Sequence, residues 1–404
     1  MIVAGLSAEF RLVAACCRPR TRPDFVQVIA AVSGNDFDPD LLLATARAHR
    51  VEGFVEDGLR AGGVMLPTSS HALLAARAKA ARLQMLRNAG EEVRIDRLFR
   101  DGGVEPVFIK GATLAMLAHG TLALKTSWDV DVLVPPTDMG TAQQILSDAG
   151  YRLDLPGIEH PFLVRRFLER NKETCWINAA RQTTIELHSA LVDDVAQLPT
   201  VGSGSPTQMV QITRNSAIAT FACPELFAYL CVHGTVHRWE RLKWLTDIAA
   251  MLESGPETIT TLHSAAPRLA VRRSMATALI LCADILGTVL PANLQTELER
   301  DRATQLLIRL SADAINKPDA VVPHSLAGLR QALTRLRAQR LLVSGLRQHL
   351  SVIRGQLSRA YTTDRLLLPV WMLPIHAVVW IPLRLLTRPW RKHQVVGGNT
   401  ASKP

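Results

Sequence analysis

The chain has 404 residues, of which 48% are hydrophobic and 20% charged, so it is too apolar for a disordered protein and long enough for two or three packed units. Its net charge of +10 comes from residues 320–404, where thirteen Arg or Lys accompany one acid, Asp364, whereas residues 1–319 carry a net charge of −2. The six cysteines have no CxxC spacing, which excludes a disulfide scaffold, disfavours a structural zinc site and fits a reducing, cytoplasmic compartment.

The first 99 residues have helical periodicity. Apolar side chains recur at intervals of three and four over residues 41–51, and a longer run of the same kind extends over residues 69–100. The Asp-Gly-Gly sequence at 101–103 is expected to end this long helix. The candidate N-caps of the long helix are Thr68, Ser69 and Ser70.

The pattern changes after residue 103, where short apolar runs alternate with helical segments. The order strand, helix, strand, helix, strand, strand predicts an α/β or α+β sheet domain at about 100–215. Pro135 and Pro136 are expected to close the second strand, with Thr137 capping the helix after it. The predicted elements are strand Val104–Ile109, helix Gly111–His119, strand Trp128–Val134, helix Thr137–Ala149, strand Glu173–Asn178 and strand Gln182–His188.

From Pro224 onward the pattern is helical again. Helices are predicted up to His237, over 241–252 and on to 310, and a basic amphipathic helix follows over 325–357. The uncharged segment 366–383 contains three prolines, which disfavour a regular membrane-spanning helix and favour a buried or membrane-surface hairpin. The predicted organisation is a helical region at 1–100, a catalytic domain at 101–215, a helical domain at 216–320 and a basic helical region at 321–404.

Two aspartates stand at the start of an otherwise apolar strand. Asp129 and Asp131 are two residues apart, so in a strand their carboxylates point to the same face. Neighbouring anions repel unless a cation lies between them, and oxygen ligands suit Mg²⁺. Glu186 is a third acid within an apolar strand, and three converging acids can hold two metals for phosphoryl or nucleotidyl transfer. The alternative interpretation is a chance pair of acids on an exposed strand.

The segment Lys110-Gly111-Ala112 connects a predicted strand to a predicted helix. Small residues at such a turn let backbone amides approach phosphate oxygens at the helix N-terminus, and Lys110 adds a positive charge. Taken alone, the same three residues are better explained by an ordinary strand-to-helix turn.

These segments together resemble a known family. Lys-Gly-Ala at 110–112, Trp-Asp-Val-Asp-Val-Leu-Val at 128–134, Asp-Ala-Gly-Tyr at 148–151 and Ile-Glu-Leu-His at 185–188 are similar to the polymerase-β-type nucleotidyltransferase superfamily. The helical pattern H-x-x-x-H…R-L-x-W-L-x-D at 233–247 is similar to the uncharacterised bacterial nucleotidyltransferase family within it. The resemblance covers nearly the whole chain and implies an α+β fold, a polymerase-β-like mixed sheet flanked by helical N- and C-terminal regions.

The resemblance also implies an activity, the transfer of an NMP from an NTP such as ATP to a hydroxyl acceptor of unknown identity. It implies that Asp129, Asp131 and Glu186 are catalytic and hold Mg²⁺ or Mn²⁺. By the same resemblance, the triphosphate contacts are Lys110, Gly111 and Ala112. The family has Gly-Gly or Gly-Ser where this chain has Gly111-Ala112, and the gap from this turn to Asp129 is longer than usual.

Three further polar residues are candidates for contact with the nucleotide. His188 shares a strand face with Glu186 and either orients a carboxylate, contacts phosphate or is a satisfied core histidine. His237 and Arg241 belong to a helical stripe with His233, which faces either the active-site cleft or an interdomain seam. A zinc site at the histidines is disfavoured because the stretch lacks the Glu of H-E-x-x-H.

The basic C-terminal region motivates a second hypothesis. A non-catalytic nucleotide- or partner-binding protein of the same fold would lie at the inner membrane face, beside envelope-polysaccharide machinery, with its basic C-terminus in peripheral contact with anionic lipid. The net charge of residues 1–319 weighs against a nucleic-acid acceptor.

Overall fold

The computed structural model describes residues 5–343 apart from 35, 156–163, 165–167, 169–170, 254–255 and 317–325. The predicted extension of the last helix to residue 357 and the predicted hairpin at 366–383 lie outside the described residues. The N-terminal part is helical, as the sequence predicts. Its helices are α1 (Ala8–Cys16), α2 (Phe25–Ser33), α3 (Pro39–His49), α4 (Glu52–Ala61) and α5 (Thr68–Asp101).

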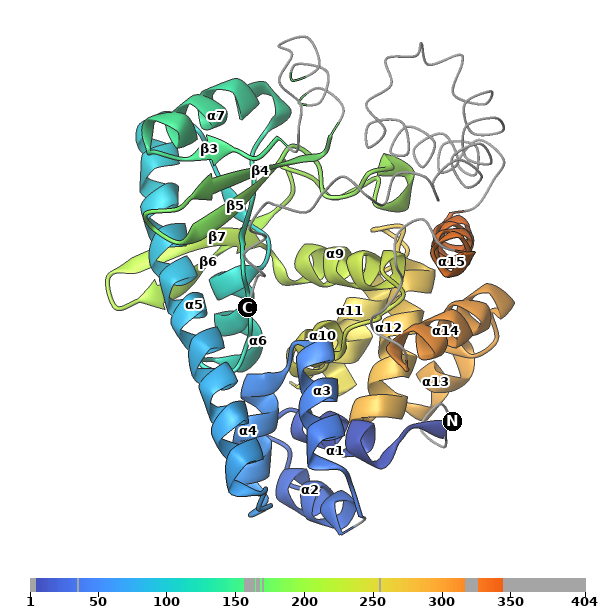
Figure 1. The fold of residues 1–404 in the computed structure, drawn as a ribbon. Coiled ribbons are helices and arrows are strands. Elements are labelled where there is room, and N and C mark those ends of the chain that lie inside the picture. The colour runs from blue at the N-terminus through green and yellow to red at the C-terminus, as the bar shows by residue number, and fades with distance from the viewer. Residues whose placement is uncertain are drawn as a thin grey trace.

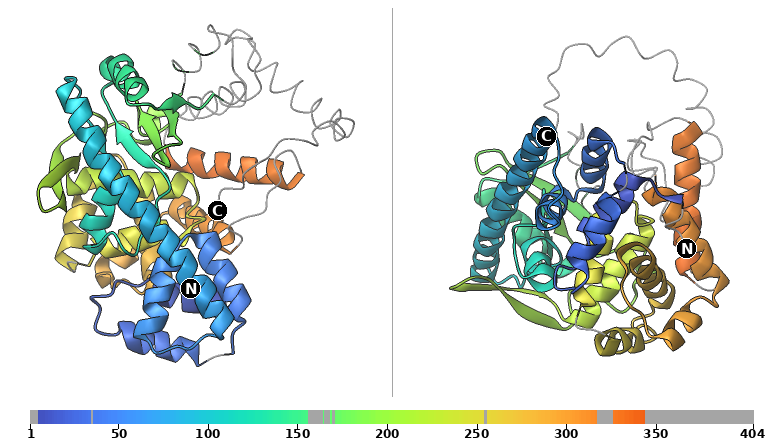
Figure 2. Two further views of the ribbon diagram at one scale, coloured as in Figure 1. Left: turned by 60° about the vertical axis from the view of Figure 1, so that its left-hand side comes forward. Right: turned by 90° about the horizontal axis from the view of Figure 1, so that it is seen from below.

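Helix α5 has 34 residues and is therefore about 50 Å long. One end lies against α4 and α3 and the other against the sheet, so α5 connects the N-terminal helices to the catalytic region (Figure 1). Two further views show it running along the outside of the molecule (Figure 2). The predicted caps are wrong, because Pro67 is the N-cap and Thr68 is already helical, which places the three hydroxyls inside the first turn.

The central sheet has five strands in the order β1-β2-β5-β4-β3 and is mixed, because β2 and β5 are parallel and the other pairs antiparallel. The predicted α+β class is confirmed. The strands are β1 (Val107–Phe108), β2 (Val130–Leu133), β3 (Arg152–Leu153), β4 (Glu173–Asn178) and β5 (Thr183–His188), and the helices between them are α6 (Gly111–His119), η2 (Pro136–Asp138) and α7 (Met139–Asp148).

The structure differs from the predicted elements in several places, among them the two-residue strand β3, which was not predicted. Strand β1 has two residues where six were predicted, and Thr137 lies in the short helix η2 instead of capping α7. A two-stranded sheet, β6 (Thr207–Thr213) and β7 (Ser216–Phe221), was not predicted. Polar residues flank and interrupt the apolar residues of β6, Met209, Val210 and Ile212, so the strand lacks the continuous apolar run of a buried strand.

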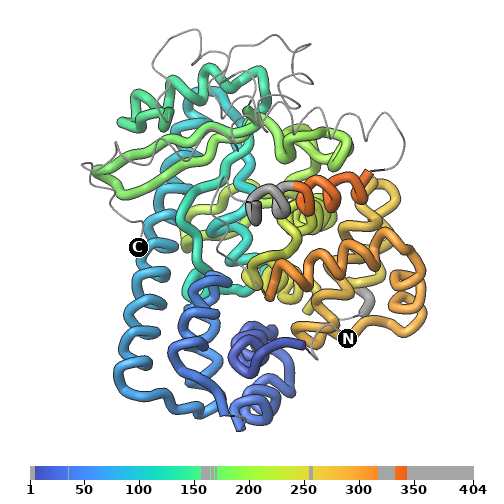
Figure 3. The backbone as a smooth tube through the Cα atoms, turned by 45° about the vertical axis from the view of Figure 1, so that its right-hand side comes forward, coloured from blue at the N-terminus to red at the C-terminus, as the bar shows by residue number. Residues whose placement is uncertain are grey.

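The C-terminal part of the described chain is a helical layer, which stacks beside the sheet domain (Figure 3). Among the described helices, none combines the length and apolarity needed to cross a bilayer. The short helix η3 (Val195–Gln197) precedes this helical layer. The helices of the layer are α9 (Cys223–Val236), α10 (Leu242–Met251), α11 (Pro256–Ala265), α12 (Arg272–Leu286), α13 (Ala292–Leu298), α14 (Arg302–Ile315) and α15 (Leu326–Leu342).

The two faces of the central sheet have different chemistry. Val130 and Val132 of β2, and Ile185 and Leu187 of β5, are fully buried in a core that α5 and α7 complete. Because side chains alternate along a strand, the intervening residues point to the opposite face, toward α9 and α10. Asp131 is one of them, so the fold directs the predicted metal acids away from the apolar core.

Helix α9 packs closely against the loop that follows it, and Gly234 makes this contact. A Cβ at residue 234 would overlap the ring of Trp239, which is fully buried and donates from Nε1 to Thr235 at 3.2 Å. We expect Gly234→Ala to lower the free energy of unfolding by about 1–3 kcal/mol, because a filled core does not accept an added methyl group. Urea denaturation measures the change.

The matched control is Gly90→Ala on α5, where an added Cβ meets no atom within 4 Å. There, alanine should leave the free energy of unfolding unchanged or raise it by up to about 1 kcal/mol. Equal effects of the two substitutions would contradict this account of α9 packing.

Candidate active site

Two carboxylates and a histidine meet on the polar face of the sheet. In the parallel pairing of β2 with β5, Asp131 lies opposite Glu186 and Leu133 opposite His188. One ligand atom from each of Asp131, Glu186 and His188 lies within 4.8 Å of the others. The prediction that Glu186 lies on a strand beside Asp131 is confirmed, and these three residues form a candidate site for a divalent metal.

Asp131 is the most deeply buried acid of this group, at 5% exposed. Lys110 Nζ lies 3.4 Å from its Oδ1, and His188 Nε2 lies 3.3 Å from the same oxygen. Burial alone would raise the pKa of Asp131, but Lys110 and His188 outweigh burial and hold it well below its usual range. Lys110 is held in turn over the ring of Tyr229, 5.4 Å from the ring centroid.

Glu186 and Asp129 show the opposite shift. Burial, together with the negative charges of Asp131 and Asp129, raises the pKa of Glu186 to about 8. Burial and the charge of Asp131 also raise the pKa of Asp129. These acids therefore lie in a field with excess negative charge, and a bound cation would relieve it.

His188 is 2% exposed, and the hydrogen-bonding state of its two ring nitrogens is unusual for a buried histidine. Its Nδ1 lies 3.4 Å from Glu173, yet among the described residues neither ring nitrogen completes a hydrogen bond. An orphaned imidazole nitrogen beside two carboxylates is a donor set that a divalent metal can use. The predicted metal ligands did not include His188, which was assigned to the nucleotide.

Asp129 lines the same cavity, of about 240 Å³, but does not belong to the group of three ligands. Its backbone is held from two sides. Ser127 Oγ donates to the Asp129 carbonyl at 2.9 Å, and the amide of Asn88, on α5, donates to the Ser127 carbonyl at 3.1 Å. Helix α5 thus fixes the segment that leads into β2.

The turn before α6 is shaped by a buried acid. Glu92 of α5 is 1% exposed, and its Oε1 accepts a hydrogen bond from the Ala112 N–H at 2.9 Å. Gly111 has a φ of 68°, and a Cβ there would overlap Glu92, so both the conformation and the space require glycine. Lys110 and Gly111 line the cavity, whereas the Ala112 N–H points to Glu92.

Helices α9 and α10 cover the polar face. The rings of His233, His237 and Trp244 lie 4.7–5.4 Å apart and line the cavity. Burial, with Lys110 nearby, lowers the pKa of His233 well below its usual range and that of His237 to about 3. Both histidines are therefore neutral at pH 7 and do not repel the lysines beside them.

The helical stripe divides between two roles. Arg241 donates from Nη1 to the Ala48 carbonyl at 2.9 Å, which joins α10 to the N-terminal helices, and it does not line the catalytic cavity. Asp247, 3% exposed, forms an ion pair with Lys125 and lies 3.1 Å from His119 Nε2. His237 faces the cavity, whereas Arg241 lies at the contact between α10 and the N-terminal helices. The sequence left a cleft and an interdomain seam as alternatives for this stripe, and each applies to part of it.

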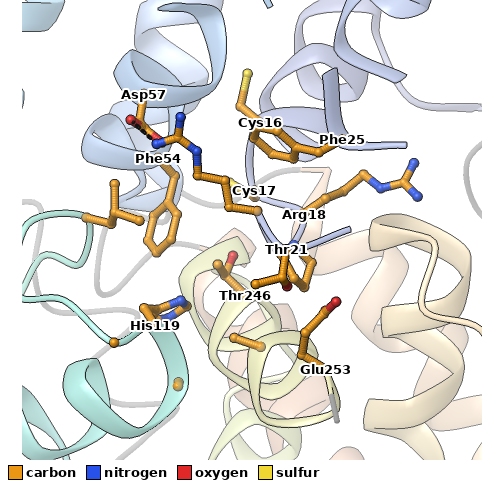
Figure 4. A pocket seen from close by; sticks show the side chains of 16 residues that line it. Cys16, Cys17, Arg18, Thr21, Phe25, Phe54, Asp57, His119, Thr246 and Glu253 are labelled. Atoms are coloured by element: carbon orange, nitrogen blue, oxygen red, sulfur yellow. Dashed lines mark hydrogen bonds and ion pairs between the residues drawn. The ribbon is translucent and has the colours of Figure 1, made fainter. Parts of the chain in front are cut away.

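A second pocket, of about 340 Å³, has His119 among its lining residues. Figure 4 shows His119 and Thr246 on one side of it, with Cys17 and Arg18 on another. Arg20 is paired with Asp57 at its edge, at 2.7 Å. Burial raises the pKa of the thiols of Cys16 and Cys17, so these cysteines are not reactive nucleophiles.

Sequence reasoning missed the cations of the cavity. Lys125, Lys172, Lys243 and Arg50 line it together with the predicted Lys110. Burial, with the charges of Arg50 and Lys125, lowers the pKa of Lys243 to about 7. Its one sequence signal is a lysine between two apolar residues, Leu242 and Trp244, on a helix that is otherwise largely buried.

The family comparison bears on this geometry. A family model described as Uncharacterised nucleotidyltransferase matches residues 35–287, which is more than half of the chain. The chain belongs to this family. The match includes α5, the sheet, α9 and α10, and therefore every residue that lines the cavity of Asp131. No curated protein and no solved structure matches the chain.

The buried acid behind the turn gives the nucleotidyltransferase a testable pH dependence. Burial raises the pKa of Glu92 from 4.5 to about 8. The folded state therefore keeps a proton that the unfolded chain has released, and the free energy of unfolding should fall by up to about 1.4 kcal/mol per pH unit between about pH 4.5 and 8. Glu92→Gln retains an oxygen for the Ala112 N–H but cannot titrate, so its stability should depend less on pH.

Urea denaturation at several pH values across this range, for the wild type and Glu92→Gln, measures the effect. Glu297→Gln, at a side chain that is 67% exposed, is the control and should follow the wild type. Parallel curves for the wild type and Glu92→Gln would show that Glu92 is not protonated in the folded chain.

Proposed function

We propose that the protein transfers an NMP from an NTP to a hydroxyl group of an acceptor, with Mg²⁺ or Mn²⁺ bound at Asp131 and Glu186. The observation that carries the proposal is the parallel pairing of β2 and β5, which brings Asp131, Glu186 and His188 within 4.8 Å in a chain that belongs to a nucleotidyltransferase family. Asp129 lines the same cavity and is proposed as a further oxygen ligand.

The residues present fit a hard divalent ion. Two carboxylates and a buried imidazole with unsatisfied nitrogens form the donor set, and the raised pKa of Glu186 indicates a surplus of negative charge. When bound, the metal would supply charge stabilisation at the α-phosphate and the leaving pyrophosphate. Glu186 is the proposed acceptor of the hydroxyl proton, because its carboxylate lines the cavity beside Asp131.

The triphosphate is proposed to bind the cationic side of the cavity. Lys110, Gly111 and Lys243 line it, and Lys243 carries no carboxylate partner within 4.0 Å among the described residues. Buried ammonium groups attract phosphate strongly because little water screens them. Ala112 is left out of the phosphate contacts because its N–H is bonded to Glu92. His237 and His188 line the cavity and remain proposed contacts of the substrate.

The first test is transfer from each of the four NTPs, labelled at the α-phosphate, with Mg²⁺ or Mn²⁺. The protein is assayed alone and with an extract of its source cells. We expect Asp131→Asn and Glu186→Gln each to lower the transfer rate at least about 100-fold, because both remove charge at the metal site. Asp148→Asn, at an exposed acid on α7, is the control and should keep full activity.

Circular dichroism and thermal unfolding of each variant confirm that the fold is retained. Wild-type turnover in the folded Asp131→Asn variant would eliminate the metal assignment. Absence of transfer by the wild type with every NTP would eliminate the enzyme.

A second prediction concerns nucleotide binding without turnover. Replacing the partly buried ammonium group by an apolar chain of similar length, Lys243→Met, should weaken binding of Mg²⁺-loaded NTP about tenfold. Lys79→Met, on the exposed side of α5, should bind as the wild type does. Isothermal titration calorimetry measures both, and equal affinities of Lys243→Met and the wild type would remove Lys243 from the triphosphate site.

A further inference from the structure

An arginine-lined groove lies between α3 and α5, outside the catalytic cavity. Its volume is about 910 Å³, within the range of small-molecule sites. Helices α3 and α5 lie side by side, and alanines from both form part of the groove lining (Figure 1). We call this cavity the arginine groove because its lining includes Arg47, Arg50, Arg77, Arg87 and Arg241.

The charge of the arginine groove is not balanced by its own acids. Among the described residues that line it, Glu52 is the one acidic side chain. Arg47, Arg77 and Arg87 form no ion pair within 4.0 Å to any described carboxylate. Like charges gathered in one concavity repel each other, and a bound anion would relieve the repulsion.

Three other arginines of α5, Arg82, Arg94 and Arg100, are paired with acids. Arg82 pairs with Glu56 at 2.6 Å, and Arg94 pairs with Glu91 at 2.5 Å. Nearby acids therefore neutralise these guanidinium groups but not those of Arg77 and Arg87, which line the groove. A guanidinium group binds two oxygens of a phosphate at once, so Arg47, Arg77 and Arg87 favour phosphate over a simple halide.

The arginine groove borders the cavity of the candidate site. Arg50 lines both, and Trp128 of the groove precedes Asp129 of the cavity. The backbone at this junction is fixed by Asn88, which donates to the carbonyl oxygens of Ser127 and Asp129. A ligand held in the groove can therefore extend one end toward the metal acids, and Trp128 offers an aromatic face on which a ring can pack.

We propose that the arginine groove binds the hydroxyl acceptor, and that this acceptor is a small phosphate ester with at least two phosphate groups. The assignment rests on the proposed nucleotidyl transfer. The phosphates bind the guanidinium groups, and the acceptor hydroxyl lies at the end of the groove nearest Asp129. The reaction then joins this hydroxyl oxygen to the α-phosphorus of the NTP, the bond to the β-phosphate breaks, and pyrophosphate leaves as the hydroxyl proton passes to Glu186.

The test is calorimetric binding of two probes to the full chain, with and without Mg²⁺ and a non-hydrolysable α,β-methylene NTP analogue. The probes are glucose 1,6-bisphosphate and adenosine 3′,5′-bisphosphate, so that sugar and nucleoside sources are compared. We expect one probe molecule per chain, bound also when the analogue is present. The double variant Arg77→Ala, Arg87→Ala should bind the probe at least about tenfold more weakly and the analogue as the wild type does.

Two control variants separate the groove from the catalytic cavity. Lys79→Ala combined with Arg97→Ala removes equal charge from exposed positions of α5 outside the groove lining, and should bind both ligands normally. Lys243→Met should lose affinity for the analogue and keep it for the probe. Thermal unfolding confirms that each variant is folded.

Three results would overturn the proposal. These are failure of the wild type to bind either probe, loss of analogue binding in the Arg77, Arg87 variant, and tighter binding of a single-stranded oligonucleotide than of either bisphosphate. The second result would assign the groove to the NTP, and the third to nucleic acid. Binding of a probe by a chain that binds no NTP would eliminate the transfer reaction while keeping the groove as a phosphate-ester site, so the two failures are distinguishable.

Discussion

The buried carboxylate of Asp131 sets the arrangement of the rest of the site. At 5% exposed it needs compensating charge, since an unpaired buried anion is strongly unfavourable. The compensation comes from Lys110, which follows β1, and His188, at the end of β5, so both neighbours of β2 in the sheet are required. Lys110 packs in turn on Tyr229, which fixes α9 over the polar face. One buried charge thus links β2 to both of its neighbours in the sheet and, through Lys110, to α9.

The N-terminal helical region completes this site through α5. Asn88 holds the segment that leads into β2, and Glu92, four residues later on the same side of the helix, holds the N-terminus of α6. Both side chains are almost wholly buried, and Met85 and Ala89 of the same helix belong to the sheet core. One helix therefore positions the metal acids and the turn beside Lys110. This dependence gives a physical reason for a family match that begins before the sheet, at residue 35.

Sequence patterns predicted the parts of this molecule that depend on local order. Strand β4 has the predicted bounds because its side chains alternate, whereas β1 pairs over two residues only. The meeting of Asp131 with Glu186 followed from the family resemblance, since no local pattern specifies which strands pair. Glu92 lies in a charge-rich stretch typical of a solvated helix face, and Lys243 is partly buried on α10, where it lines the cavity. Tertiary packing decides both, so their neighbours in sequence could not indicate their roles.

Unequal neutralisation of the cations explains how this cavity can favour a phosphate. Asp131 pairs with Lys110 and Asp247 with Lys125, whereas Lys243 has no carboxylate within 4.0 Å among the described residues. Burial, together with the charges of Arg50 and Lys125, lowers the pKa of Lys243 to about 7. A triphosphate bound there would reverse the balance and raise that pKa, so binding at neutral pH is coupled to uptake of a proton. The carboxylates on the sheet show the opposite imbalance, which a cation relieves. A metal-loaded NTP carries both charges and satisfies both sides of the cavity together, whereas the metal or the phosphate alone satisfies one.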